Sequence, residues 1–216
     1  VDSTSASVDV RDSPLDPHFL SSQFRVELVD NFGYLMRFFR KVEELVDNPP
    51  SNCPPIIAVD FEGVKLCRNG ELCLAQFCLH DDQCTVYVLD VFSLGKDAFQ
   101  AKSPRGTSVQ SILESPAIRK VWFDPRNDVD ALYHQFGIET QGIFDLQVAE
   151  VAERRNRRLG VRYVQGLFKC LTNCPSLSDK HKLFAEKIDI LGKNLFEPEN
   201  GGSYEVFRMR PLHPII

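Results

Sequence analysis

Apolar and polar residues follow a helical period near the start of the chain. Pro49 and Pro50 end this pattern, and an apolar run over residues 24–29 precedes it. Apolar side chains recur every three or four positions, at Leu35, Phe38, Phe39, Val42, Leu45 and Val46. This spacing predicts an amphipathic helix that packs on the domain that follows.

Three segments rich in β-branched and aromatic residues then predict three strands. They cover residues 56–61, 72–79 and 85–91, and Asn69-Gly70 between the first two is a tight-hairpin signal. Helical and strand patterns alternate afterwards. We expect strands at 120–123 and near 143, and helices over 108–114, 127–136, 146–155, 161–171 and 178–191.

This order of elements predicts an α/β fold. An antiparallel meander followed by α/β units gives a mixed sheet flanked by helices, and the ribonuclease H-like arrangement fits that order. Residues 1–22 are rich in Ser, Asp and Pro without periodicity, which predicts a disordered N-terminal tail. Residues 23–216 are then expected to form one domain.

Composition narrows the function. The 25 basic and 30 acidic residues give a net charge of −5, which excludes a nucleic-acid binder that relies on a strongly basic surface, but not a nuclease with metal-binding carboxylates. No segment approaches the roughly 20 apolar residues needed to cross a membrane. Seven cysteines without repeated spacing favour reduced thiols over a disulfide framework or a zinc site, and hence an intracellular protein of the cytoplasm or nucleus.

Two carboxylates end the first strand of the meander, in Val59-Asp60-Phe61-Glu62-Gly63. Residues i and i+2 of a strand point to the same face, so Asp60 and Glu62 can converge on one point. Two close carboxylates repel each other unless a cation lies between them, and hard oxygen ligands suit Mg²⁺ or Mn²⁺. The competing interpretation is a strand end whose acids simply face solvent.

A second acidic segment joins the predicted strand at 120–123 to the next helix. Its acids are Asp124, Asp128 and Asp130. Acidic residues at a helix start ordinarily cap the helix or complement its dipole. From the residues alone we favour that role for each of them.

Together the two segments resemble the DEDD superfamily of 3′–5′ exonucleases, in the branch related to ribonuclease D. The resemblance covers about residues 24–216. It is carried by 59–63 with 70–77, by 120–129 with Leu132, 136–138 and 144–147, and by Leu195-Phe196, 201–207 and 210–212, which are closest to the Egalitarian-like group. In this family the acid of the second motif falls on Asp128.

The resemblance implies a two-metal mechanism with Mg²⁺ or Mn²⁺. Asp60 would bridge both ions, Glu62 would bind one and position the attacking water, and Asp128 would complete the second site. The family usually has His-Gly where this chain has Phe123 and Asp124. A third motif, Tyr-x-x-x-Asp, would follow Arg-Pro-Leu and does not occur in the 216 residues. We therefore expect a fragment truncated before that motif, with weak activity or none.

We expect a local basic patch to bind the substrate. Residues 151–170 carry six positive charges and one negative charge, and the candidates for nucleic-acid binding are Arg154, Arg155, Arg157, Arg158 and Arg162. A solvated helix face is the alternative interpretation of these arginines.

Three hypotheses follow for the function. The first is a metal-dependent 3′–5′ exonuclease acting on RNA or single-stranded DNA. The second is a catalytically inactive exonuclease-like adaptor that binds RNA or a protein partner. The third is another ribonuclease H-like protein, such as an endonuclease or a structural module.

Overall fold

The computed structural model describes residues 25–50, 53–81, 85–214 and 216; the tail predicted over 1–22 lies outside them. Six strands form one mixed sheet in the order β1-β4-β3-β2-β5-β6, in which β2, β3 and β4 pair antiparallel and the remaining pairs are parallel. The strands are β1 Val26–Val29, β2 Ile56–Val64, β3 Glu71–Leu79, β4 Val86–Asp90, β5 Arg119–Trp122 and β6 Ile143–Asp145. The predicted meander with following α/β units is confirmed.

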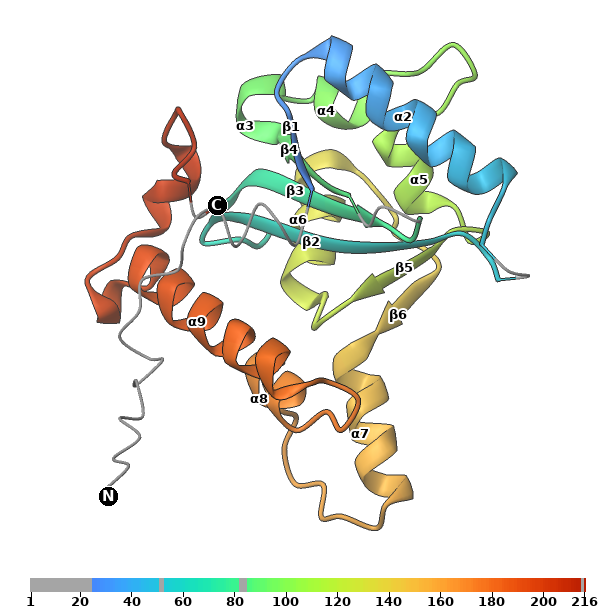
Figure 1. The fold of residues 1–216 in the computed structure, drawn as a ribbon. Helices are drawn as coiled ribbons and strands as arrows, with labels where there is room; N and C mark the ends of the chain where they lie inside the picture. The colour runs from blue at the N-terminus through green and yellow to red at the C-terminus, as the bar shows by residue number, and fades with distance from the viewer. Residues whose placement is uncertain (1–24, 51–52, 82–84, 215) are drawn as a thin grey trace, which may run out of the picture.

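Helices cover both faces of this sheet (Figure 1). Those within the first 140 residues are α2 Phe32–Asp47, α3 Val91–Leu94, α4 Asp97–Gln100, α5 Val109–Glu114 and α6 Arg126–Phe136. Those that follow are α7 Leu146–Asn156, α8 Leu167–Thr172, α9 Asp179–Phe196 and the 3₁₀ turns η2 Pro198–Asn200 and η3 Tyr204–Arg208. None of the helices in the described ranges combines the length and apolar character needed to span a bilayer.

The main core lies between the sheet and α2, α4, α5 and α6. Every predicted apolar position of α2 is buried except Val46, which is 42% exposed. Phe38 packs its ring against Phe77 of β3 and Tyr87 of β4, with ring centroids 5.3 and 5.1 Å apart. Burial of this aromatic cluster fixes α2 on the sheet.

A smaller core on the opposite face holds the C-terminal segment. Val206 and Phe207 of η3 pack against Cys73 and Leu74 of β3. Arg210 forms an ion pair with the buried Asp90 at the end of β4. The segment after α9 therefore lies on the sheet face that also carries the side chains of Asp60 and Glu62.

One local prediction is confirmed and one is wrong. Asn69-Gly70 lies in a turn of the six-residue connection between the antiparallel strands β2 and β3, where the N–H of Gly70 donates to the carbonyl of Cys67 at 3.1 Å. Residues 161–166 are not helical, and α8 begins only after its N-cap residue Gly166. Gly160 and Gly166 flank this segment, and glycine disfavours a continuous helix.

Candidate active site

Strand β2 presents Asp60 and Glu62 on one face of the sheet. Its alternate residues Ile57, Val59 and Phe61 enter the main core. Because side chains alternate along a strand, both acids point to the opposite face, as the sequence predicts. The β2–β3 register shifts between Glu62 and Gly63, so the strand changes its pairing directly after the second acid.

Asp128 reaches the same region from β5 and α6. Residues 123–125 connect the strand to the helix, with Asp124 in a left-handed conformation (φ 55°). Pro125 precedes the first turn of α6 and makes no side-chain cap. Asp128 lies in that first turn and is only 7% exposed. It is therefore held inward, unlike an ordinary dipole partner on a helix surface.

The three carboxylates interact electrostatically. Desolvation raises the pKa of Asp60 to about 6, although its side chain keeps contact with solvent. Desolvation and the charges of Asp60 and Asp128 raise the pKa of Glu62 to about 8. Desolvation and the charge of Asp60 raise the pKa of Asp128 to about 7. Asp60 thus lies within electrostatic reach of Glu62, which is on the same strand, and of Asp128, which belongs to the second acidic segment.

No described residue forms an ion pair with Asp60, Glu62 or Asp128. The indole N–H of Trp122 opposes the rise in the pKa of Asp128, yet this buried nitrogen lacks a hydrogen bond of acceptable geometry within the described ranges. Three carboxylates without a cationic partner favour an external cation, and an all-oxygen donor set suits Mg²⁺ or Mn²⁺.

The side chains of Asp60, Glu62 and Asp128 do not by themselves form a complete metal site. Among the described residues, no three His, Cys, Asp or Glu side chains form a group compact enough to hold a metal ion. The three carboxylates have the donor chemistry of a divalent-ion site. A complete ligand set would need additional oxygens from water, substrate or further protein residues.

The other acids of the second segment form ion pairs in place of the caps expected of them. Asp124 pairs with Arg126 through Oδ2 and Nη2 at 2.7 Å. Asp130 pairs with Arg68 in the β2–β3 connection and also accepts the backbone N–H of Arg68 at 2.7 Å. Asp130 thereby ties the loop after the first motif to the helix of the second motif.

The five candidate arginines fall into two groups. Arg154 and Arg157 form i,i+4 ion pairs with Glu150 and Glu153 along α7. The other three have no ion pair among the described residues: Arg155, Arg158 and Arg162. Figure 1 shows α7 pointing away from the sheet edge at β6. We call residues 146–196, which contain α7, α8 and α9, the arm; all five arginines belong to it.

One aromatic residue on this arm was not among the sequence candidates. Tyr163 is 70% exposed, and the guanidinium of Arg162 lies 5.3 Å from the centroid of its ring. An exposed aromatic ring beside unpaired arginines is typical of surfaces that stack nucleic-acid bases. The Arg-Tyr pair inside a basic run was the signal available in the sequence.

Asp145 positions the segment that carries Asp128, and its removal tests this role. Its Oδ1 accepts the N–H of Asp124 at 3.1 Å and the N–H of Gln147 at 2.8 Å. We expect Asp145→Ala to lower the free energy of unfolding by about 1–2 kcal/mol, because a helix cap and a loop hydrogen bond are lost. Urea unfolding measures this change. Asp145→Asn keeps an acceptor and is the control; equal losses in both variants would contradict the assignment.

Comparison with known proteins identifies the class that this fold and site define. A family model described as 3′–5′ exonuclease matches residues 38–183, a range that includes all three acids. The chain therefore belongs to the 3′–5′ exonuclease family, and the predicted resemblance to the DEDD superfamily is confirmed.

Individual relatives agree with this assignment. The human piRNA biogenesis protein EXD1 is 35% identical over 163 residues, which cover 74% of this chain and 28% of that protein. The structure of a Trypanosoma brucei RNase D–GMP complex matches with a TM-score of 0.62 and 25% identity, over 88% of this chain and 51% of that one. The T. brucei RNase D complex with RNA U12 matches with a TM-score of 0.55 and 24% identity, over 81% and 63% respectively. The ribonuclease H-like fold class is confirmed.

Proposed function

We propose that this chain is a metal-dependent 3′–5′ exonuclease domain that hydrolyses terminal phosphodiester bonds of RNA or single-stranded DNA. The observation that carries the proposal is the electrostatic coupling of Asp60, Glu62 and Asp128 within residues matched by an exonuclease family. Desolvated carboxylates with raised pKa values and no cationic partner among the described residues are costly to the fold, and such sites are characteristic of function.

The three acids have distinct proposed roles. Asp60, which interacts with both other acids, would hold two ions between them, while Glu62 and Asp128 would each complete one site. When bound there, divalent ions would supply activation of a water and stabilisation of the leaving oxygen of a phosphodiester. Glu62 would also orient the attacking water at the 3′ end.

RNA is the substrate that the relatives favour. The human relative is named for piRNA biogenesis, and the T. brucei structure is a ribonuclease with bound GMP, a nucleoside monophosphate of the kind that exonucleases release. This chain spans 28% of the length of the human protein.

The unpaired arginines are proposed to hold the phosphates of the substrate. Replacing Arg155, Arg158 and Arg162 together by Gln is expected to weaken single-stranded RNA binding about tenfold at moderate salt and to reduce the salt slope of log K by about 2, since each phosphate contact to a single strand contributes about 0.7. Fluorescence anisotropy at several salt concentrations measures both quantities.

A control is available beside these residues, at the C-cap of α7. Arg157→Gln removes one positive charge that is already paired with Glu153, at a distance of 2.7 Å. Its affinity for RNA should stay within about twofold of the parent chain, because exposed ion pairs contribute little. A triple variant that binds RNA like the parent would contradict the role of these arginines.

The direct test of the proposed function is shortening of 5′-labelled RNA with Mn²⁺, followed on a sequencing gel. The 216 residues lack the fourth acid of the Tyr-x-x-x-Asp motif, so we expect weak or no cleavage from this chain. A version to which a segment with a Tyr-x-x-x-Asp motif is added after Ile216 should cleave at least about 100-fold faster, since a missing metal ligand misplaces the ion.

Two outcomes decide against this proposal. Equal rates in both versions would refute the requirement for the third motif. RNA binding without metal-dependent shortening in either version would favour the adaptor hypothesis. Internal cleavage, in place of a ladder that shortens from the 3′ end, would indicate an endonuclease.

A further inference from the structure

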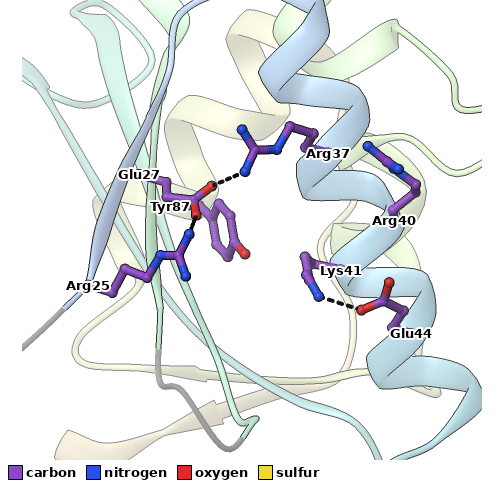
Figure 2. Close-up of a pocket in the computed structure, with 7 residues that line it drawn as sticks. All are labelled: Arg25, Glu27, Arg37, Arg40, Lys41, Glu44 and Tyr87. Carbon is purple, nitrogen blue, oxygen red and sulfur yellow. Dashed lines mark hydrogen bonds and ion pairs between the residues drawn. The ribbon is translucent and has the colours of Figure 1, made fainter.

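A second polar pocket lies away from the acidic site. It has a volume of about 260 Å³ and is formed by β1, α2 and β4 (Figure 2). Tyr87 forms the wall on β4, and its side chain lies on the sheet face covered by α2. Asp60 and Glu62 point to the opposite face, so this pocket is separate from the proposed active site.

Cations outnumber anions around this pocket. Four basic side chains line it, together with two glutamates: Arg25, Arg37, Arg40, Lys41, Glu27 and Glu44. Glu27 lies 2.7 Å from Arg25 and 3.9 Å from Arg37, and Lys41 pairs with Glu44 at 2.7 Å. The local charge is therefore +2 within a protein whose net charge is −5. Such a local excess attracts anions.

Tyr87 adds a neutral hydrogen-bond donor inside the pocket. The residue is 3% exposed, and Figure 2 shows its hydroxyl pointing into the space between Arg25 and Lys41. Burial, with the charges of Glu27 and Asp81, raises the pKa of Tyr87 to about 12, so the hydroxyl keeps its proton. A protonated hydroxyl that lines a pocket can donate a hydrogen bond to a bound acceptor.

An aromatic surface adjoins the cations. A neighbouring depression of about 420 Å³ shares Arg25, Glu27 and Arg37 with the pocket and is lined by Tyr34. Tyr34 is 43% exposed, and the guanidinium of Arg37 lies 5.5 Å from its ring centroid. Exposed aromatic rings and guanidinium planes are the groups on which nucleobases stack.

We propose that this pocket is a nucleotide-binding site in which Arg37, Lys41 and the Tyr87 hydroxyl bind a terminal phosphate. Arg40 adds charge at the rim, and Tyr34 lies where the nucleoside would extend. A phosphate monoester is favoured because it carries nearly two negative charges and several strong acceptor oxygens. The site does not depend on the proposed nuclease function, since none of its residues lies at the acidic site.

The test uses GMP as the probe, titrated into the chain in EDTA so that the acidic site holds no metal. Calorimetry should show that GMP binds at one site and that inorganic phosphate displaces GMP from it. Arg37→Gln should weaken GMP binding about tenfold, and Tyr87→Phe, which keeps the ring, several-fold, as expected for lost hydrogen bonds to a charged group. Lys96→Gln removes an equally exposed charge elsewhere and should leave the affinity unchanged.

Competition with oligonucleotides distinguishes a free nucleotide from an RNA end as the ligand, and three other results would contradict the proposal. Displacement of GMP by a 5′-phosphorylated oligonucleotide, but not by its unphosphorylated form, would identify an RNA end as a ligand; no displacement by either would leave the free nucleotide. Guanosine binding as tightly as GMP would overturn the proposal. An equal loss of GMP affinity in Lys96→Gln and Arg37→Gln would also overturn it. A GMP affinity that changes only in Asp60→Asn would place GMP at the acidic site, whether or not the chain is a nuclease, and would overturn the proposal as well.

Discussion

Asp60→Asn is expected to abolish divalent-metal binding and to lower the rate of 3′-end cleavage by at least about 1,000-fold. The charge of Asp60 raises the pKa values of both Glu62 and Asp128, so Asp60 lies within electrostatic reach of both acids. The amide has nearly the same shape but carries no charge, and it is a poor ligand for Mn²⁺ or Mg²⁺. Calorimetric titration of Mn²⁺ measures binding, and 5′-labelled RNA measures the rate.

Metal binding keeps this prediction testable even if the 216-residue chain does not cleave RNA. Asp130→Asn is the matched control, because Asp130 lies on the same helix as Asp128 but pairs with Arg68. It should retain Mn²⁺ binding and lose at most about 1 kcal/mol of stability, as is usual for an exposed pair. Unchanged Mn²⁺ affinity in Asp60→Asn would sink the assignment of the site.

The sequence predicts the first half of this site from local rules alone. Each predicted strand lies within a few residues of its observed bounds, except that β2 continues beyond Phe61 to Val64. Alternation along that strand correctly separates Asp60 and Glu62 from the buried residues between and before them. Period-two patterning suffices here because one face of β2 packs in the core.

The second half needed more than local pattern. Nothing in residues 120–132 distinguishes Asp128 from Asp124 or Asp130 as the acid that faces Asp60; the family resemblance made that choice. The distinction arises from tertiary packing. Asp128 is buried, whereas the other two find arginine partners. The raised pKa values follow from this packing and cannot be read from residue identity.

The arm formed by α7, α8 and α9 shows where patterning fails. The apolar residues at 161, 164 and 167 suggest a helix, yet α8 starts at Leu167. Helix α9 instead extends five residues beyond its predicted end, to Phe196. Residues of α8 and α9 are at most partly buried, so tertiary contacts select their boundaries weakly. Gly166 precedes the start of α8, whereas α9 continues through Gly192.

The stability of the metal-free protein should fall as the pH rises, mainly through Glu62. Its pKa is about 8 in the folded state against 4.5 ordinarily, so between these values the folded state binds more protons than the unfolded state. Stability therefore decreases as pH rises through this window, and the penalty is complete above about pH 8. Asp128, with a pKa of about 7, and Asp60, with a pKa of about 6, act in the same direction.

Glu62→Gln is expected to remove the largest part of this penalty. At pH 8 in EDTA the variant should be more stable than the parent chain by about 2–4 kcal/mol, and at pH 5 the difference should nearly vanish. Urea unfolding at both pH values measures it. Glu205→Gln, in an exposed ion pair with Arg208, is the control and should show no such pH dependence.

Addition of Mn²⁺ should reverse the order of the two proteins. A divalent ion stabilises the charged form of Glu62 and binds only the folded state, so the parent chain gains stability with metal concentration while Glu62→Gln gains much less. If Glu62→Gln is less stable than the parent at pH 8 without metal, the carboxylate has a cationic partner within the protein, and the site does not depend on a metal for its charge balance. Stabilisation by the substitution together with loss of the metal response is the result expected of a carboxylate kept for function at the expense of stability.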